Sequence, residues 1–329
     1  MKKTLLTVIA LVAGLTSVSA IDSNTVEVTY NGSSATISVA SNIASYVTVS
    51  SGTSSHVKIV QSAAFAGVDA TVDNEDGEII YVLKGTSTDG EFYLDGSFKC
   101  TVELNGLTLT NPSGPAINIQ NGKRIAVSAQ KGTTNTLTDG ANETYKGCYH
   151  CKGHTKFKGK GTLTVKGNSR HAIYSGEYIE VKNLTLNVTG AVKDGIHCQE
   201  YFLMESGTVT INSTGDDGLQ VELDGLTSTG TTTGHEDEDS GNFYMTGGTL
   251  NITGYTGKAV KADGLISTTG GTRNFSASDM EAYSGIDGVT VDAAETIVSD
   301  LSGRRMGHSA RPGIYVVRQG GKTVKKVVR

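Results

Sequence analysis

The hydrophobic positions of the chain recur at a constant 23-residue step between positions 161 and 260. In each repeat, two apolar residues flank one polar residue in the same phase. These pairs are Leu163/Val165, Leu186/Val188, Val209/Ile211 and, after one insertion, Leu250/Ile252. A fixed period of this length is typical of a solenoid in which each repeat forms one coil.

Each repeat contains two further strand signals. The second strand begins at a corner that carries His171, Asp194 or Asp217 in three successive repeats and Lys258 in the fourth. The third strand has an apolar pair in one phase: Ile179/Val181, Phe202/Met204 and Phe243/Met245. Strands this short bury their apolar faces by stacking on the next coil, about 4.8 Å away. The pattern therefore predicts a parallel β-helix with three strands per coil.

We accordingly expect an all-β protein whose main body is a right-handed parallel β-helix (a solenoid) over residues 91–264. The handedness follows from the rule for parallel crossovers. Residues 21–90 alternate with period two and are interpreted as an N-terminal β cap that covers the open end of the solenoid. The Thr-, Gly- and Ser-rich residues 265–290 read as a linker, and residues 291–329 as a small C-terminal β tail.

Residues 1–20 have the form of a secretion signal peptide. Lys2 and Lys3 precede an apolar run over residues 5–15, and residues 18–20 have the small-x-small form of a cleavage site. The run is too short to cross a membrane. We therefore expect a secreted or cell-surface protein without a membrane span.

Charge is unevenly distributed along the chain. Of the 28 Lys and Arg residues, two lie in the signal and eight in residues 304–329, whereas neither segment contains any of the 33 Asp and Glu residues. Residues 21–303 thus carry 18 basic and 33 acidic groups, a formal net charge of −15. This acidic body disfavours a nucleic-acid partner.

The aspartate corner is a candidate metal site. Asp194 and Asp217 lie one repeat apart, with Asp216 beside the second, so stacked coils bring these carboxylates within about 5–7 Å. Such a pair requires a cation, a proton or screening by water. Calcium binds six to eight oxygens, including carboxylates and turn carbonyls, and is the predicted cofactor. The alternative is that the aspartates cap tight turns through their own backbone.

The insertion, at about residues 224–241, carries the acidic segment His235-Glu236-Asp237-Glu238-Asp239. Asp237 and Asp239 could complete the calcium shell. A solvated loop is the alternative, because the spacing does not match an EF-hand.

Tyrosines are candidate carbohydrate contacts. Tyr178 and Tyr201 lie one repeat apart and are expected to stack outward on adjacent coils, together with Tyr174 and beside Lys193. A ladder repeat near 5 Å approximates the rise per unit of an extended glycan, and tyrosine rings suit sugar stacking. The alternative is that these rings only shield the sheet.

The cysteines allow three interpretations. Cys148 and Cys151 form a C-x-x-C pair, and Cys148 is expected to share the inward phase of Ile117 and Ile173. Buried thiols, a disulfide between Cys198 and one member of the pair, and a zinc site are the three possibilities.

Several short motifs resemble those of one known family, the secreted carbohydrate-binding, calcium-containing parallel β-helices related in fold to pectate-type polysaccharide lyases. The motifs are NGLTLTN at 105–111, SGPAI at 113–117, GTTNTLTDG at 132–140, GKGTLTV at 159–165 and KDGIH at 193–197. The resemblance covers about residues 80–264 and implies calcium-assisted polysaccharide binding, with no catalytic activity established for the family as a class. The C-terminal pattern resembles a type IX secretion sorting domain of Bacteroidetes-like bacteria, which implies secretion machinery as a partner.

Three functions remain open at this stage. A binder of acidic, pectin-like glycans would need calcium to bridge the carboxylates of glycan and protein. A polysaccharide lyase would also need a base near the metal, and Arg170, Lys193 and Lys258 lie at or near the aspartate corner. A structural stalk or adhesin would need neither. We favour the non-enzymatic binder.

Overall fold

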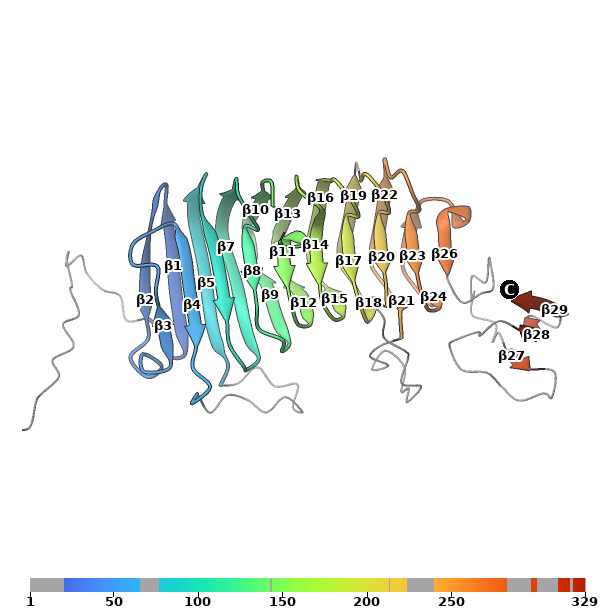
Figure 1. The fold of residues 1–329 in the computed structure, drawn as a ribbon, viewed down its shortest axis with the longest axis horizontal. Coiled ribbons are helices and arrows are strands. Elements are labelled where there is room, and N and C mark those ends of the chain that lie inside the picture. Colours follow the sequence, from blue (N-terminus) through green and yellow to red (C-terminus); the bar gives the residue numbers. More distant parts are fainter. Residues whose placement is uncertain are drawn as a thin grey trace, which may run out of the picture.

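The computed structural model is a solenoid of short strands stacked in parallel along one axis (Figure 1). It describes residues 21–65, 77–142, 144–212, 214–223 and 240–282, together with the backbone of three strands between residues 297 and 328. The predicted signal peptide and the acidic segment with Asp237 and Asp239 lie outside the described residues.

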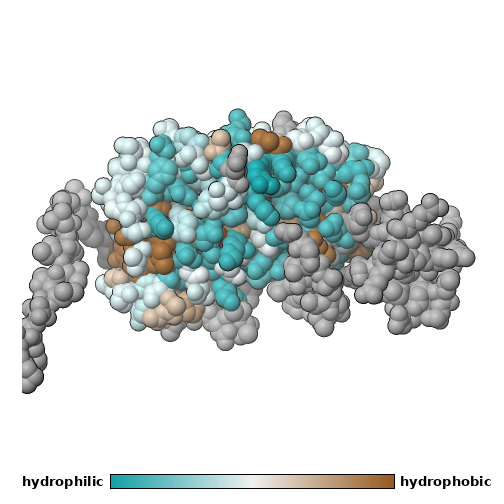
Figure 2. Space-filling model, viewed as in Figure 1, coloured by the Kyte–Doolittle hydropathy of each residue, from teal (hydrophilic) through white to brown (hydrophobic). Residues whose placement is uncertain are grey.

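One face of the solenoid is a ten-stranded sheet that is parallel except at its N-terminal edge. Its strands, in spatial order, are β3 (Val47–Val49), β4 (His56–Gln61), β6 (Glu91–Asp95), β8 (Ile117–Ile119), β11 (Gly147–Cys151), β14 (His171–Ser175), β17 (Ile196–Cys198), β20 (Leu219–Val221), β23 (Val260–Ala262) and β26 (Met280–Ala282). This is the near face in Figure 1, and Figure 2 shows that hydrophilic side chains cover most of it.

The other two faces are branches of one sixteen-stranded sheet that join at β7 (Cys100–Asn111). One branch contains β10 (Thr134–Asp139), β13 (Thr162–Gly167), β16 (Thr185–Ala191), β19 (Thr208–Asn212), β22 (Thr249–Thr253) and β25 (Thr272–Asn274). The second contains β9 (Ile125–Ala129), β12 (Thr155–Gly159), β15 (Ile179–Lys182), β18 (Tyr201–Met204), β21 (Asn242–Met245) and β24 (Ile266–Thr268). At the N-terminal end lie β1 (Thr25–Asn31), β2 (Ser34–Val39) and β5 (Ile79–Ser87).

The strand register confirms the repeat and the three strands per coil. Leu186 pairs with Val209, its equivalent one repeat later, and Val209 pairs with Leu250 across the insertion. The inward residues form stacks in the core, as in Phe202 and Phe243, whose parallel rings lie 5.5 Å apart between centroids. The core is dry because these side chains are fully buried.

The predicted linker is wrong for the described residues up to Ala282. β24, β25 and β26 pair in parallel with β21, β22 and β23, so the solenoid continues for one more coil. The repeat step even persists, because Thr249 pairs with Thr272. The apolar signal was lost because Arg273 takes the place that Leu250 holds one coil earlier.

The N-terminal segment also differs from a separate cap. β1 pairs in parallel with β5, and β4 pairs in parallel with β6, so both belong to the solenoid. Only β2 and β3 run antiparallel, beside β1 and β4 respectively. These two strands cover part of the terminal edge, so the expected boundary near residue 90 does not exist.

The phase expected for Cys148 is wrong by one residue. Tyr149, and not Cys148, pairs with Ile117 on one side and Ile173 on the other. Both Cys148 and Tyr149 are fully buried, because the strand turns its residues inward without strict alternation here.

The C-terminal pattern does form strands. β27 (Ile297–Asp300), β28 (Gly313–Gln319) and β29 (Lys322–Val328) make a three-stranded antiparallel sheet. Helix is nearly absent from the described residues: the short 3-10 turn η2 (Ala277–Asp279) is far below the length that a membrane-crossing helix requires.

The stacked aromatic core gives a stability prediction. Replacing Phe202 with Ala should cost about 3–5 kcal/mol, because it leaves a cavity beside Phe243 that the stacked coils cannot close. Thr185→Ala, an exposed change in β16, should stay within about 0.5 kcal/mol of the parent. Urea unfolding followed by circular dichroism measures both, and equal stability of the two variants would contradict the stacked core.

Candidate functional site

The predicted corner residues form a column along the solenoid axis, at or just before the first residues of β14, β17, β20 and β23. The backbone N–H of Asp194 donates to His171 Nδ1 at 3.3 Å, and that of Asp217 donates to Asp194 Oδ1 at 3.1 Å. The N–H of Lys258 donates to Asp217 Oδ1 at 2.6 Å. The superposition of Asp194 on Asp217 is therefore confirmed. Each carboxylate accepts a backbone N–H from the next coil, and not from its own turn.

The predicted carboxylate cluster exists. Oxygens of Asp194, Asp216 and Asp217 all lie within 4.8 Å of one another. Asp194 and Asp217 are buried, whereas Asp216 is exposed. Burial raises the pKa of Asp217, and the charges of Asp194 and Asp216 raise it further, against the lowering effect of Lys258 N–H and of Lys261. This excess of negative charge is what a bound cation would relieve.

Two histidines, which the sequence analysis did not select as site residues, flank Asp194. His171 Nδ1 lies 3.1 Å and His197 Nδ1 lies 3.0 Å from Asp194 Oδ2. Both rings are about 5% exposed. Burial lowers the pKa of His171 to about 4 despite its contact with Asp194, so this ring is neutral near pH 7. Although burial opposes ionisation of Asp194, the two histidines hold its pKa well below the usual range.

A sequence signal for these histidines was available. His171 lies one repeat before Asp194, and His197 lies three residues after it, in the next outward position of the corner.

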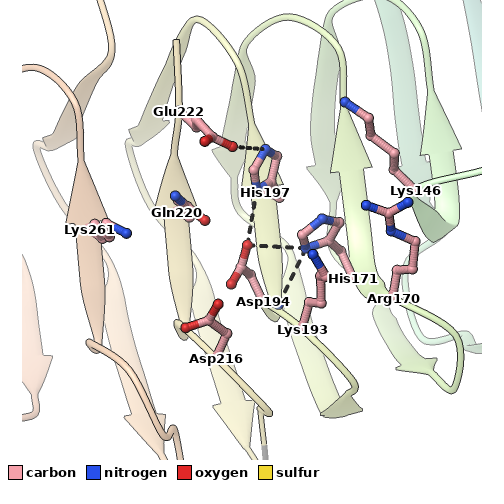
Figure 3. Close-up of a pocket in the computed structure, with 10 residues that line it drawn as sticks. All are labelled: Lys146, Arg170, His171, Lys193, Asp194, His197, Asp216, Gln220, Glu222 and Lys261. Atoms are coloured by element: carbon pink, nitrogen blue, oxygen red, sulfur yellow. Dashed lines mark hydrogen bonds and ion pairs between the residues drawn. The ribbon is translucent and has the colours of Figure 1, made fainter. Parts of the chain in front are cut away.

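These groups border a pocket of about 260 Å³ on the ten-stranded sheet. Its lining is entirely polar or charged: Lys146, Arg170, His171, Lys193, Asp194, His197, Asp216, Gln220, Glu222 and Lys261. Figure 3 shows Asp194 between the two histidines, with Asp216 below it and the side chains of Arg170 and Lys146 on the far side of His171. The pocket thus combines acidic groups with a rim of cations.

The lysines and arginine proposed as lyase bases separate into two groups. Arg170 and Lys193 line the pocket. Lys258 does not line it, and its Nζ lies 3.8 Å from Glu281 Oε2. Lys261 contributes the cation beside Asp217 instead, with its Nζ 3.8 Å from Asp217 Oδ2.

The tyrosines stack as predicted but are not exposed. The rings of Tyr178 and Tyr201 lie 4.7 Å apart and nearly parallel, yet they are 8% and 3% exposed. They pack with Leu203 in a small cluster separate from the main core. Tyr174 is 5% exposed and lies under Lys146, whose Nζ is 4.9 Å from the ring centroid. The expectation of an open tyrosine face is therefore wrong, because these rings are covered in the fold.

A second column of charge, also missed in the sequence, lies beside the tyrosine stack. Glu177 and Glu200 occupy equivalent positions in two successive coils, whereas His154, from the coil before them, is equivalent to Tyr178. His154 Nε2 lies 2.5 Å from Glu177 Oε2 and 3.3 Å from Glu200 Oε2, and its ring stacks on Tyr178. Burial alone would lower the pKa of His154, but the two carboxylates raise it to about 9. A protonated histidine thus offsets one of the two carboxylate charges of this cluster.

The cysteines are buried free thiols, as the first of the three interpretations expected. Cys100, Cys148, Cys151 and Cys198 are all unpaired and without exposed surface. The disulfide interpretation is wrong for this structure. The possible metal clusters among the described residues contain no cysteine, so the structure gives no support to a zinc site on thiolates.

Comparisons with known proteins agree with this architecture. A family model described as "Carbohydrate-binding domain-containing protein" matches residues 66–307, more than two thirds of the chain. A solved structure, "Structure of the polysaccharide lyase-like protein from C. thermocellum, Gadolinium derivative", aligns with a TM-score of 0.57 and 19% identity over 78% of this chain and 99% of that chain. At this identity, the likeness shows the fold alone. No curated protein matches the sequence significantly.

The raised pKa of His154 predicts a pH dependence of stability. Below about pH 6.5, both folded and unfolded chains carry the proton, and the ion pairs contribute fully. Between about pH 6.5 and about pH 9 the unfolded chain loses it first, so the free energy of unfolding should fall by up to about 3 kcal/mol.

Urea unfolding at pH 6 and pH 9 measures this fall. His154→Gln should remove most of it, whereas His56→Gln, which changes a partly exposed histidine paired with Asp89, should retain it. An equal pH dependence in both variants would contradict the assignment.

Proposed function

The chain belongs to the carbohydrate-binding domain-containing protein family, and from this premise we propose that it is an exported polysaccharide-binding protein. We propose further that it binds acidic, pectin-like polysaccharide at the corner pocket with the help of calcium. The observation that carries this proposal is the Asp194–Asp216–Asp217 carboxylate cluster, of which Asp194 and Asp216 line a pocket that also has a rim of Lys and Arg side chains.

The donor set at this corner fits calcium. Asp216 is exposed and Asp217 has one carboxylate oxygen beyond its backbone hydrogen bond, so both can face an ion at the pocket. Calcium takes six to eight oxygens, and water or glycan carboxylates supply those that the protein does not. When bound, the ion would neutralise the like charges and bridge an acidic glycan to a body of net charge −15. Asp237 and Asp239 remain proposed additional ligands.

The cations on the rim give the glycan its second set of contacts. Lys193 is exposed, while Arg170, Lys146 and Lys261 are partly exposed, so they can reach uronate carboxylates or hydroxyl groups in the pocket. Strand neighbours along the sheet, Tyr174, His197, Gln220 and Lys261, form one row with a repeat near 5 Å, in which Tyr174 and His197 are buried and Gln220 and Lys261 are partly exposed. An extended glycan lying along this row meets successive coils.

A polysaccharide lyase is the second candidate. Arg170 and Lys193 stand in the same pocket as the carboxylates, which is the arrangement that proton abstraction beside a metal-bound uronate needs. Lys258 is withdrawn from this role by its position next to Glu281. A structural stalk remains the third possibility, with the pocket unused.

Export and sorting complete the proposal. The signal-like residues 1–20 direct the chain out of the cytoplasm, and the basic C-terminal strands β28 and β29 are proposed to address it to secretion machinery of the type IX kind. The mature protein would then act at the cell surface or in the medium.

Calcium dependence is the test. Calorimetric titration of polygalacturonate into the full chain should show binding that EDTA abolishes and added calcium restores. The double variant Asp216→Asn/Asp217→Asn should weaken binding about tenfold or more, equal to about 1.4 kcal/mol. Asparagine keeps an oxygen that can accept the Lys258 N–H, so the fold is preserved.

Asp95→Asn, on β6 of the same sheet and remote from the corner, is the matched control and should bind as the parent does. Binding that ignores EDTA would refute the calcium bridge. Ultraviolet absorbance of unsaturated uronides in the same samples would establish the lyase, and an absence of glycan binding would leave the stalk.

A further inference from the structure

Three ligand atoms converge at the buried end of the corner pocket. His171 Nδ1 and His197 Nδ1 lie 3.1 and 3.0 Å from Asp194 Oδ2, and all three groups lie within 4.8 Å of one another. The three residues come from adjacent coils, so the strand register fixes their separation. All three side chains are at least nine-tenths buried.

Hydrogen bonds do not account for all the contacts of this cluster. The backbone N–H of Asp194 donates to His171 Nδ1 at 3.3 Å, a long contact that uses the one lone pair of this nitrogen. An ion bound at Nδ1 would replace this contact. The same nitrogen lies 3.1 Å from Asp194 Oδ2, an acceptor to which it has no proton to donate. At His197, Nδ1 faces Asp194 Oδ2 and Nε2 faces Glu222 Oε2 at 3.4 Å.

A metal ion would be held by both histidines and the carboxylate together. Two ligands at about 2.0–2.1 Å from a tetrahedral zinc ion lie about 3.3 Å apart, which is close to the 3.1 and 3.0 Å that separate the two histidine nitrogens from Asp194 Oδ2. We propose that His171, Asp194 and His197 form a binding site for a first-row transition-metal ion such as Zn²⁺. Two imidazoles and one carboxylate are ligands that such ions accept readily.

This site differs from the proposed calcium site in both chemistry and position. Calcium binds hard oxygen ligands, and two of the three atoms here are nitrogens. The two sites share Asp194, but its Oδ2 faces the histidines whereas its Oδ1 accepts the N–H of Asp217. The inference therefore does not depend on calcium or on glycan binding.

The pocket leaves one side of the site open. Gln220, Glu222 and the cations Lys193 and Arg170 line the space next to the histidines. Three protein ligands with an open fourth position are typical of zinc sites that hold water or an exchangeable ligand. An anion attracted by the cationic rim is the chemical class that would occupy this position.

Cobalt(II) is the probe, since four-coordinate Co²⁺ absorbs visible light far more strongly than the aqueous ion. The full chain, stripped of metal by a chelator and dialysed, should bind one Co²⁺ with this absorption, and Zn²⁺ should displace it. His171→Gln and His197→Gln should each weaken binding by about tenfold or more. His56→Gln, in which the histidine is remote, should bind as the parent does, and thermal melting checks that each variant is folded.

Two further measurements keep the outcome decisive. His154→Gln removes the other histidine–carboxylate cluster, and loss of the Co²⁺ signal in that variant would overturn the assignment. Three other results would also overturn the assignment. They are an aqueous Co²⁺ spectrum with the parent chain, an unchanged Co²⁺ affinity in His171→Gln or His197→Gln when that variant is folded, and displacement of Co²⁺ by a hundredfold excess of Ca²⁺. If Asp216→Asn/Asp217→Asn keeps the Co²⁺ absorption but loses glycan binding, the transition-metal site and the calcium-dependent glycan site are independent of each other.

Discussion

Parallel hydrogen bonding between successive coils is the constraint on which the rest of this structure depends. It fixes equivalent residues at one strand spacing, so any side chain type that repeats in sequence becomes a column in space. The columns Tyr178–Tyr201 and Asp194–Asp217 arise in this way. The same constraint that builds a dry core also forces like charges together on the surface.

The two charged columns resolve that conflict differently. Glu177 and Glu200 share one cation, His154, which keeps its proton because both carboxylates contact one nitrogen. At the aspartate corner, burial keeps His171 neutral, and Lys261 lies 3.8 Å from Asp217. The first column therefore keeps one uncompensated carboxylate charge, whereas the corner has three carboxylates with Lys261 beside them, which is why the corner is the better place for a cation.

The sequence predicted the solenoid well because apolar alternation and glycine corners follow directly from stacking. The coil of β24 to β26 was missed because Arg273 interrupts that alternation. β25 still pairs with β22, since the hydrogen bonds between these strands are made by the backbone. The burial of Tyr178 and Tyr201 was missed because periodicity reports which face a side chain leaves from, and not what lies over it. The histidine pair was not selected as a site, although His171 was placed in the aspartate column, because the sequence does not show that His171 and His197 approach the same oxygen of Asp194.

The corner aspartates combine structural and chemical roles on separate oxygens. Oδ1 of Asp194 and of Asp217 accepts the backbone N–H of the next coil, and thereby holds the register that creates the site. The remaining oxygen of Asp194 faces two histidines, and that of Asp217 faces Lys261. Because one oxygen is committed to the fold, ligand chemistry at the other can vary between coils without loss of the stack. Removing either side chain entirely would confuse the two roles, whereas asparagine keeps the structural oxygen, removes the charge and replaces the other oxygen with an NH₂ group.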